Sequence, residues 1–210
     1  KEMIYPDQFI PVLEKNGYVI DVDNFIWNKV CACIKMMEDK GIEPVPISVN
    51  VSRMHVYQEK FTENLKNMAG EYGIDPKYIP LEITESAFTK EEGSLFKKVQ
   101  SLQGYGFKFS MDDFGSGYSS LGMLKSERVD EVKIDKTFVD DIATDKGKVL
   151  LGNVIRMINE LGIDMIAEGV ETKEQADFLK ENGCMYAQGY YYYKPMPIEE
   201  FAKLLENSAR

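Results

Sequence analysis

The chain has 210 residues, of which 44% are hydrophobic and 29% charged, and this composition is typical of a globular domain. The formal net charge of −10 argues against sequence-independent binding to duplex nucleic acid, because such binding needs basic patches that neutralise phosphates. No apolar run approaches the roughly 18 residues of a membrane span, so we expect no direct membrane contact.

The cysteines and the single histidine favour structural roles. Cys31, Cys33 and Cys184 are odd in number and form no Cys-x-x-Cys motif, which indicates buried thiols in a reducing, cytoplasmic compartment. A full-length protein could still be anchored to a membrane elsewhere. His55 stands alone, so it cannot support a histidine metal site, and we expect it to be solvated or to cap a helix.

Helical segments alternate with short β-rich runs along the chain. We expect helices at residues 21–40, 54–72, 89–102, 146–161, 172–182 and 197–206, and strands at 45–52, 79–86, 107–114, 129–135, 164–170 and 185–192. Glycine follows many of the helices, and capping boxes begin at Thr89 and Thr172. This alternation predicts parallel strands joined by crossover helices, within one domain over residues 1–210.

The strands alternate polar and apolar residues, with the polar set toward the carboxyl end. A doubly wound sheet gathers its ligand at one crevice, whereas a barrel gathers polar residues from many strand ends at one mouth. The pattern therefore predicts an α/β fold of the TIM-like (β/α)8 barrel type. Six strands are two short of eight, and such barrels have about 250 residues, so we expect the chain to lack N-terminal strands over roughly forty residues.

The strand ends would bring an acidic group of side chains to the barrel mouth: Asn50, Glu82, Glu85, Asp112, Asp113, Lys133, Asp135, Glu168, Glu171 and Gln188. Carboxylates that crowd together must take up a proton or find a cation, and oxygen ligands suit Mg²⁺ or Mn²⁺. The adjacent Asp112 and Asp113 could serve two ions that activate water for an in-line displacement. A solvated acidic turn is the alternative for these two residues.

Three further features have both functional and structural interpretations. Lys133 could orient a water or stabilise a phosphoryl group, or it could form an ion pair with Asp135 or Glu131. The loop at 113–121 has only part of a dinucleotide-binding pattern, and we interpret it as a mobile loop that repositions Asp113. The tyrosines at 190–193 could stack on a nucleobase, although packing in the core and rim is the favoured interpretation.

Six ordered motifs carry a family resemblance. SVNVS (48–52), LEITES (81–86), DDFGSGYSSL (112–121), VKID (132–135), AEGVET (167–172) and QGYYYYKPMP (188–197) resemble the successive signatures of bacterial EAL domains, and FIPVLEKNGYV (9–19) fits the start of that family. The resemblance covers essentially the whole chain. It implies a TIM-like barrel that hydrolyses cyclic di-GMP to linear pGpG, with two bound Mg²⁺ or Mn²⁺ ions.

The resemblance also implies a role for each matching residue. Asn50, Glu82 and Asp112 match the ligands of one metal, Asp113 matches a ligand of the second, and Lys133 matches the residue that holds the attacking water. Glu168 and Gln188 match residues that support the metals and the water. Glu85 matches the glutamate that anchors the loop after Asp113, a loop tied to dimerisation. The matching loop and substrate positions are Gly115, Ser116, Gly117, Tyr118 and Pro195.

One departure keeps other functions open. The Glu-Ala-Leu segment that names the family, and whose glutamate is a metal ligand, does not occur in the 210 residues, so we expect this stretch alone to be weak or inactive. The alternatives are a receptor that binds cyclic di-GMP without cleaving it, a structural or dimerisation barrel, and a barrel enzyme acting on an enolisable substrate. As partners the resemblance implies a second copy of the chain and regulatory domains such as GGDEF or PAS.

Overall fold

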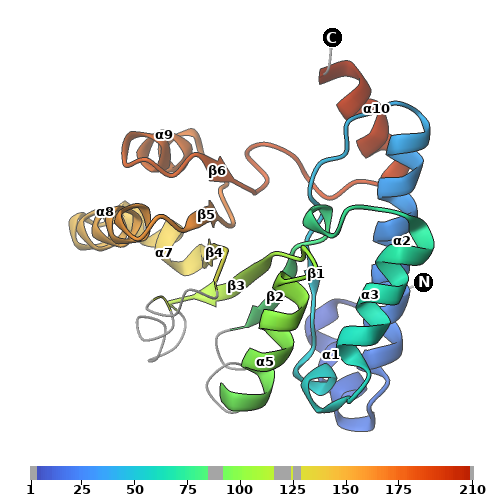
Figure 1. Ribbon diagram of the computed structural model, residues 1–210. Coiled ribbons are helices and arrows are strands. Elements are labelled where there is room, and N and C mark those ends of the chain that lie inside the picture. The colour runs from blue at the N-terminus through green and yellow to red at the C-terminus, as the bar shows by residue number, and fades with distance from the viewer. Residues whose placement is uncertain (1–3, 85–91, 116–123, 125–128, 209–210) are drawn as a thin grey trace. The chain divides into compact units, whose positions relative to one another are not determined.

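The computed structural model describes residues 4–84, 92–115, 124 and 129–208, which fall into two compact units (Figure 1). The first unit comprises Lys1–Ile83 and Gly93–Phe107, and the second comprises Thr84–Glu92 and Lys108–Arg210. Each unit contains its own parallel strands and its own helices.

The first unit is built around two short parallel strands. β1 (Val49–Asn50) pairs with β2 (Leu81–Thr84), and Asn50 stands in register with Glu82. The helices are α1 (Pro6–Asn16), α2 (Val19–Asp39), α3 (Phe61–Tyr72) and α5 (Glu92–Gln103), with 3₁₀ turns η1 (Arg53–Tyr57) and η2 (Pro76–Tyr78). Buried apolar side chains from both helices and strands, such as Trp27, Leu65 and Leu81, form its core.

The second unit contains four strands that pair in parallel in chain order. They are β3 (Phe109–Phe114), β4 (Glu131–Ile134), β5 (Asp164–Ala167) and β6 (Tyr186–Ala187). The other elements are α7 (Lys136–Asp140), η3 (Asp141–Ala143), α8 (Asp145–Glu160), α9 (Lys173–Glu181) and α10 (Ile198–Ser208). Because all four strands run the same way, their carboxyl ends lie at one edge.

One face of α8 closes the core of the second unit. Leu151, Ile155 and Ile158 recur at helical spacing and are fully buried, in one cluster with strand residues such as Val132 and Ile134. Full burial of each such side chain contributes about 1.5–3 kcal/mol relative to exposure. Figure 1 shows α8 beside β5 and α9 beside β6, so these helices cover the strands next to them. The predicted capping box of Thr172 and Gln175 starts α9, as expected.

One helix expected from the sequence was wrong, and two helices of the structure, α1 and α7, were not expected. The helix expected at 54–72 is divided, since Gln58 takes an extended conformation between η1 and α3. This break lets His55 and Phe61 both turn into the core, which an unbroken helix would not allow at that spacing. The capping box expected at Thr89 lies outside the described residues.

His55 is neither solvated nor a helix cap. Its side chain is 1% exposed, and its Nε2 lies 3.1 Å from Asp23 Oδ2, so the expected role was wrong. The expectation for the cysteines was right: Cys31, Cys33 and Cys184 are free and buried, and burial raises the pKa of the Cys31 thiol to about 12. Among the helices that the structure describes, none combines the length and apolarity needed to cross a membrane.

Two glycines of α8 test how tightly this helix is packed. A Cβ at Gly147 would lie 1.9 Å from the backbone oxygen of Asp141 in η3, whereas a Cβ at Gly152 would lie 3.0 Å from the side-chain Oδ1 of Asn182. We expect Gly147→Ala to lower the free energy of unfolding by about 1–3 kcal/mol, because backbone must move. Gly152→Ala should change it by less than about 1 kcal/mol, since a side chain can rotate away and alanine favours helix. Urea denaturation of both variants measures the difference, and equal effects would contradict the packing described.

Candidate functional site

The polar residues of the second unit gather at the carboxyl ends of its strands. Asp112 and Asp113 lie in β3 and Lys133 lies in β4, while Glu168 directly follows β5 and Gln188 directly follows β6. The parallel pairing of these strands brings the five residues to one edge. This is the edge at which parallel α/β folds place their functional side chains.

A β-bulge places both aspartates opposite one lysine. Met111 pairs with Val132 and Phe114 pairs with Ile134, so two residues of β3 face the single residue Lys133 of β4. Neighbouring residues of a regular strand point to opposite faces, but a bulge re-aims one of them. Asp113 has φ 56, the left-handed conformation that aspartate tolerates better than most residues, and its amide donates a 3.0 Å hydrogen bond to Asp112 Oδ1.

The environment of Asp113 disfavours its negative charge. Burial raises the pKa of its carboxyl group above the ordinary value, and the carboxylates of Asp112, Asp135 and Glu168 raise it further. Lys133 acts in the opposite direction and only partly offsets them. A half-buried carboxylate among other carboxylates either takes up a proton or binds a cation.

Lys133, Glu168 and Gln188 form a connected group beside these aspartates. Lys133 is 5% exposed, and its Nζ lies 2.7 Å from Glu168 Oε1. The same Oε1 accepts a 2.8 Å hydrogen bond from Nε2 of Gln188. A buried ammonium group is costly without such a partner, so Glu168 compensates the charge of Lys133 at the strand ends.

The backbone around Gln188 is fixed by a close approach of two chain segments. The Gln188 amide donates to the Ala167 oxygen at 2.9 Å, and the Gln188 oxygen accepts from the Val170 amide at 3.1 Å. At the next residue a Cβ would lie 2.1 Å from the Val170 oxygen, so only glycine fits at Gly189. These contacts set the position from which Gln188 reaches Glu168.

The first unit contains a pair of candidate oxygen ligands. Asn50 and Glu82 stand in register on β1 and β2, so their side chains leave the two strands in the same direction. Glu82 is 6% exposed, whereas Asn50 is exposed to solvent. An amide oxygen and a carboxylate in register are suitable donors for a hard divalent cation.

The candidate metal ligands fit such a cation in their chemistry. Asn50, Glu82, Asp112 and Asp113 all present oxygen, which Mg²⁺ and Mn²⁺ prefer, and Asp113 occupies a place where a positive charge would be stabilised. Within the part of the chain that the structure describes, no three His, Cys, Asp or Glu side chains converge as a complete metal site. The four candidates are divided between the two units.

Two other acidic residues expected at the mouth have structural bonds. Asp135 caps α7, because its Oδ1 accepts a 2.9 Å hydrogen bond from the Thr137 amide. Glu171 pairs with Lys136 at 2.8 Å. Asp135 still adds to the negative charge that raises the pKa of Asp113. The bonds of Asp135 and Glu171 nevertheless give both residues structural roles that need no bound ligand.

The loop after β3 is described only at its first residue. Gly115 has φ 97, and a Cβ there would lie 2.0 Å from the ring of Phe138, so this position accepts only glycine. Glu85, Ser116, Gly117 and Tyr118 lie outside the described residues. Pro195 is exposed.

The tyrosines after Gln188 do not pack in the core, so the core part of the favoured interpretation was wrong, whereas packing at the rim stays a prediction. Their exposed fractions run from 41% to 60%. The rings of Tyr191 and Tyr192 meet edge to face at 5.1 Å, and Lys194 Nζ lies 5.6 Å from the ring centre of Tyr190. Aromatic faces are therefore accessible to solvent close in sequence to Gln188.

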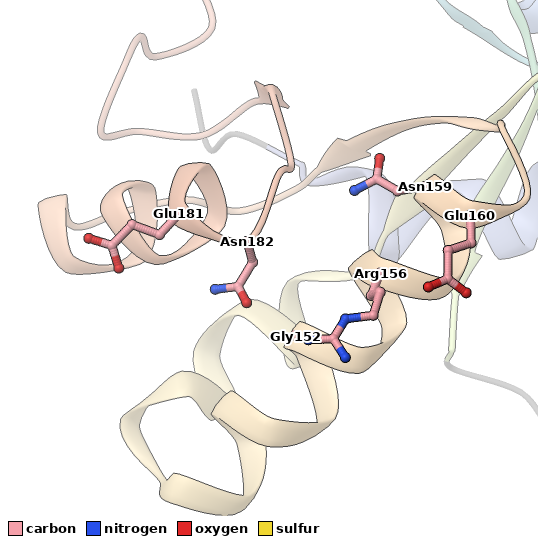
Figure 2. A pocket seen from close by; sticks show the side chains of 6 residues that line it. All are labelled: Gly152, Arg156, Asn159, Glu160, Glu181 and Asn182. Carbon is pink, nitrogen blue, oxygen red and sulfur yellow. The ribbon is translucent and has the colours of Figure 1, made fainter.

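A polar groove of about 370 Å³ lies elsewhere in the second unit (Figure 2). It is lined by α8 and the end of α9, at Gly152, Arg156, Asn159, Glu160, Glu181 and Asn182. Crossover helices run against their strands, so the groove lies toward the amino ends of the strands, away from Lys133 and Glu168. Asn159 donates to the Gly183 oxygen and Asn182 donates to the Phe178 oxygen, which gives these amides structural roles.

Sequence reasoning missed two residues that hold the end of strand β1 around the candidate ligand Asn50. Trp27 Nε1 donates a 3.0 Å hydrogen bond to the backbone oxygen of Asn50, and Asp23 Oδ2 accepts a 3.1 Å hydrogen bond from the backbone amide of Ser52. Both lie on α2, far from the motifs in sequence. Their spacing of four residues on one helix face was the available signal.

The unfavourable charge on Asp113 can be measured through its effect on the stability of the folded protein. Its carboxyl pKa is raised in the folded protein, so the ionised form destabilises the fold at neutral pH, and the penalty disappears as pH falls toward the ordinary value of about 3.9. We expect Asp113→Asn to raise the thermal midpoint at pH 7.5 in a chelator, with a gain that shrinks at lower pH. Asp141→Asn removes an exposed charge in η3 and serves as the control. A gain that did not depend on pH would contradict this account.

Comparison with known proteins assigns the chain to a family. The family model described as EAL domain matches residues 1–195. The chain is 34% identical over 201 residues to the signaling protein YkoW of Bacillus subtilis (strain 168), covering 95% of this chain and 25% of YkoW. It is 33% identical over 203 residues to the probable cyclic di-GMP phosphodiesterase PdeG of Escherichia coli (strain K12), covering 96% of this chain and 40% of PdeG. The chain thus spans well under half the length of these relatives.

A solved structure agrees with this assignment. The PaMucR phosphodiesterase in complex with c-di-GMP is 31% identical to the chain, with a TM-score of 0.88, covering 94% of this chain and 81% of that one. The likeness confirms the predicted fold class, an α/β fold of the TIM-like barrel type. Because the family model matches most of its length and these relatives share its sequence and fold, the chain belongs to the EAL domain family.

Proposed function

We propose that the chain is a single EAL-type barrel domain, and that the complete protein to which it belongs hydrolyses cyclic di-GMP to linear pGpG with Mg²⁺ or Mn²⁺. The observation that carries this proposal is the bulge that sets Asp112 and Asp113 opposite the buried Lys133. The name of PdeG and the c-di-GMP bound to PaMucR support the choice of substrate.

The proposed metal ligands are the oxygen donors that match the motifs of the EAL domain family. Asn50, Glu82 and Asp112 would hold one ion, and Asp113 would hold a second. Two ions there would activate water and stabilise the oxygen that leaves phosphorus. The raised pKa of Asp113 supports this role, because a cation relieves the charge crowding that burial and neighbouring carboxylates create.

Lys133 would position the attacking water. Its ammonium group, charged by virtue of Glu168, donates a hydrogen bond to the water oxygen and aims its lone pair at phosphorus. The water oxygen then forms a bond to phosphorus as the P–O3′ bond breaks, the water gives up a proton to solvent, and the departing O3′ takes one up. Gln188 holds Glu168 in place, so that Lys133 keeps its direction during the displacement.

The rest of the assignment concerns the setting of the domain. We infer that Glu85 anchors the loop after Asp113, and that Gly115, Ser116, Gly117, Tyr118 and Pro195 line the substrate or this loop. We infer a homodimer from the family resemblance, in which the loop after Asp113 is tied to dimerisation. The short span relative to YkoW and PdeG supports further regulatory domains, such as GGDEF or PAS, in a cytoplasmic signalling protein.

Substitutions at the bulge and at the lysine test the mechanism. In the natural full-length protein we expect Asp112→Asn and Lys133→Met to lower cyclic di-GMP hydrolysis by about 100-fold or more, since each removes a charge that stabilises the transition state. Chromatography of pGpG measures the rate, and circular dichroism checks the fold. Lys108→Met is the matched control, because Lys108 precedes the same strand β3 but pairs with Asp164, 3.6 Å away. Unchanged hydrolysis in either site variant would refute its role.

Removal of metal tests the cofactor and separates enzyme from receptor. Treatment with EDTA should abolish hydrolysis, and added Mg²⁺ or Mn²⁺ should restore it, because the carboxylates alone cannot activate water. The 210-residue chain, which contains no Glu-Ala-Leu segment, should turn over more slowly than the natural full-length protein. If the natural full-length protein bound cyclic di-GMP tightly but formed no pGpG in Mg²⁺ or Mn²⁺, it would be a receptor instead of an enzyme.

A further inference from the structure

The end of strand β1 is held at two points by one face of α2. Trp27 Nε1 donates to the backbone oxygen of Asn50 at 3.0 Å, and Asp23 Oδ2 accepts from the backbone amide of Ser52 at 3.1 Å. Asp23 and Trp27 are four residues apart, so they leave the helix on the same side. Their contacts bracket the buried Val51 and thereby fix the peptide groups on both of its sides.

These contacts come from a buried, closely packed group. Trp27, Asp23 and His55 are 2%, 7% and 1% exposed. His55 Nε2 lies 3.1 Å from the same Asp23 oxygen that binds Ser52, and the Trp27 and His55 rings are 4.5 Å apart. The Phe61 ring lies beside both of them, with its centre 5.4 Å from that of His55 and 6.2 Å from that of Trp27. Side chains held in this way have little freedom, so the hydrogen bonds that they make have a fixed direction.

The opposite edge of β1 is fixed by β2. The Val49 amide donates to the Pro80 oxygen and the Val51 amide donates to the Glu82 oxygen, each at 2.9 Å. Strand pairing therefore holds the residues on either side of Asn50, while Trp27 holds the carbonyl of Asn50 itself. The backbone of Asn50 is fixed from two directions, yet its side chain remains exposed and available to a ligand.

We propose that Trp27 and Asp23 are positioning residues for Asn50, and that they set how tightly the divalent cation bound by Asn50 is held. The inference rests on the proposed function, in which the Asn50 side-chain oxygen is a metal ligand. Contacts that orient a ligand of a metal typically change its affinity by 10- to 100-fold when they are removed. Trp27→Phe keeps an aromatic ring but removes the N–H donor together with part of the buried indole, so a second variant of the same aromatic group is needed to measure the effect of lost packing.

The test measures Mn²⁺ binding by calorimetry in the natural full-length protein, without cyclic di-GMP. We expect Asn50→Ala to weaken binding strongly and Trp27→Phe to weaken it by about 10-fold. Phe61→Leu is the matched control, because it loosens the same aromatic group without removing a hydrogen bond to β1. It should lower the thermal midpoint and leave the Mn²⁺ affinity within about twofold of the wild type.

Asp23 provides a rescue experiment that packing alone would not reproduce. Asp23→Asn retains an oxygen that can accept from the Ser52 amide, whereas Asp23→Ala does not. We expect the alanine variant to bind Mn²⁺ about 10-fold more weakly and the asparagine variant to recover most of that loss. Equal losses in both variants would overturn the role of Asp23.

The remaining outcomes separate this inference from the proposed function. Wild-type affinity in Trp27→Phe, together with weak binding in Asn50→Ala, would overturn the inference and leave the function intact. If Phe61→Leu lowered the Mn²⁺ affinity as much as Trp27→Phe, the inference would be overturned too, because looser packing of the aromatic group would then explain both losses. Wild-type affinity in Asn50→Ala would remove Asn50 from the ligands and the inference with it. No Mn²⁺ binding by the wild type would refute metal dependence and the inference together.

Discussion

The crowding of carboxylates around Asp113 is the constraint on which the candidate site depends. A regular strand would send Asp112 and Asp113 to opposite faces, and only one would meet the other strand ends. The bulge brings both against Lys133, at the cost of a left-handed backbone at Asp113 and a carboxyl group whose pKa is raised. Such strain persists only where the surrounding structure enforces it, and here β4, β5 and their paired side chains do so.

Glu168 makes this arrangement possible because it serves two neighbours with one oxygen. It compensates the charge of Lys133, which is buried, and it accepts from Gln188. Without Glu168 the ammonium group of Lys133 would be buried without this partner, which is costly. The positive charge opposite the aspartates therefore depends on β5, and the direction of Glu168 depends on the glycine-enforced contact after β6.

The sequence allowed the fold class to be predicted, because each physical signal was local. Glycines that stop helices, the capping box at Thr172 and the period of two in the strands all depend on neighbouring residues. The candidate residues could also be placed at strand ends by counting. The bulge could not be predicted, since a change of register depends on the partner strand. The partner of Lys133 was missed for the same reason: Glu168 lies 35 positions away in sequence, whereas spacing suggested Asp135 or Glu131.

The errors in the first unit have a related cause. His55 was expected in solvent because a lone histidine has no local partner, yet Asp23 and the Trp27 ring enclose it from a different helix. The same long-range contacts break the helix expected at 54–72, since His55 and Phe61 must both face inward. A buried polar group so fully packed specifies one geometry more strictly than an apolar core would. In this unit the packed group includes Trp27, which donates a hydrogen bond to the backbone of Asn50, the exposed residue in register with Glu82. The packing that local patterns failed to predict therefore also fixes the backbone of a candidate ligand.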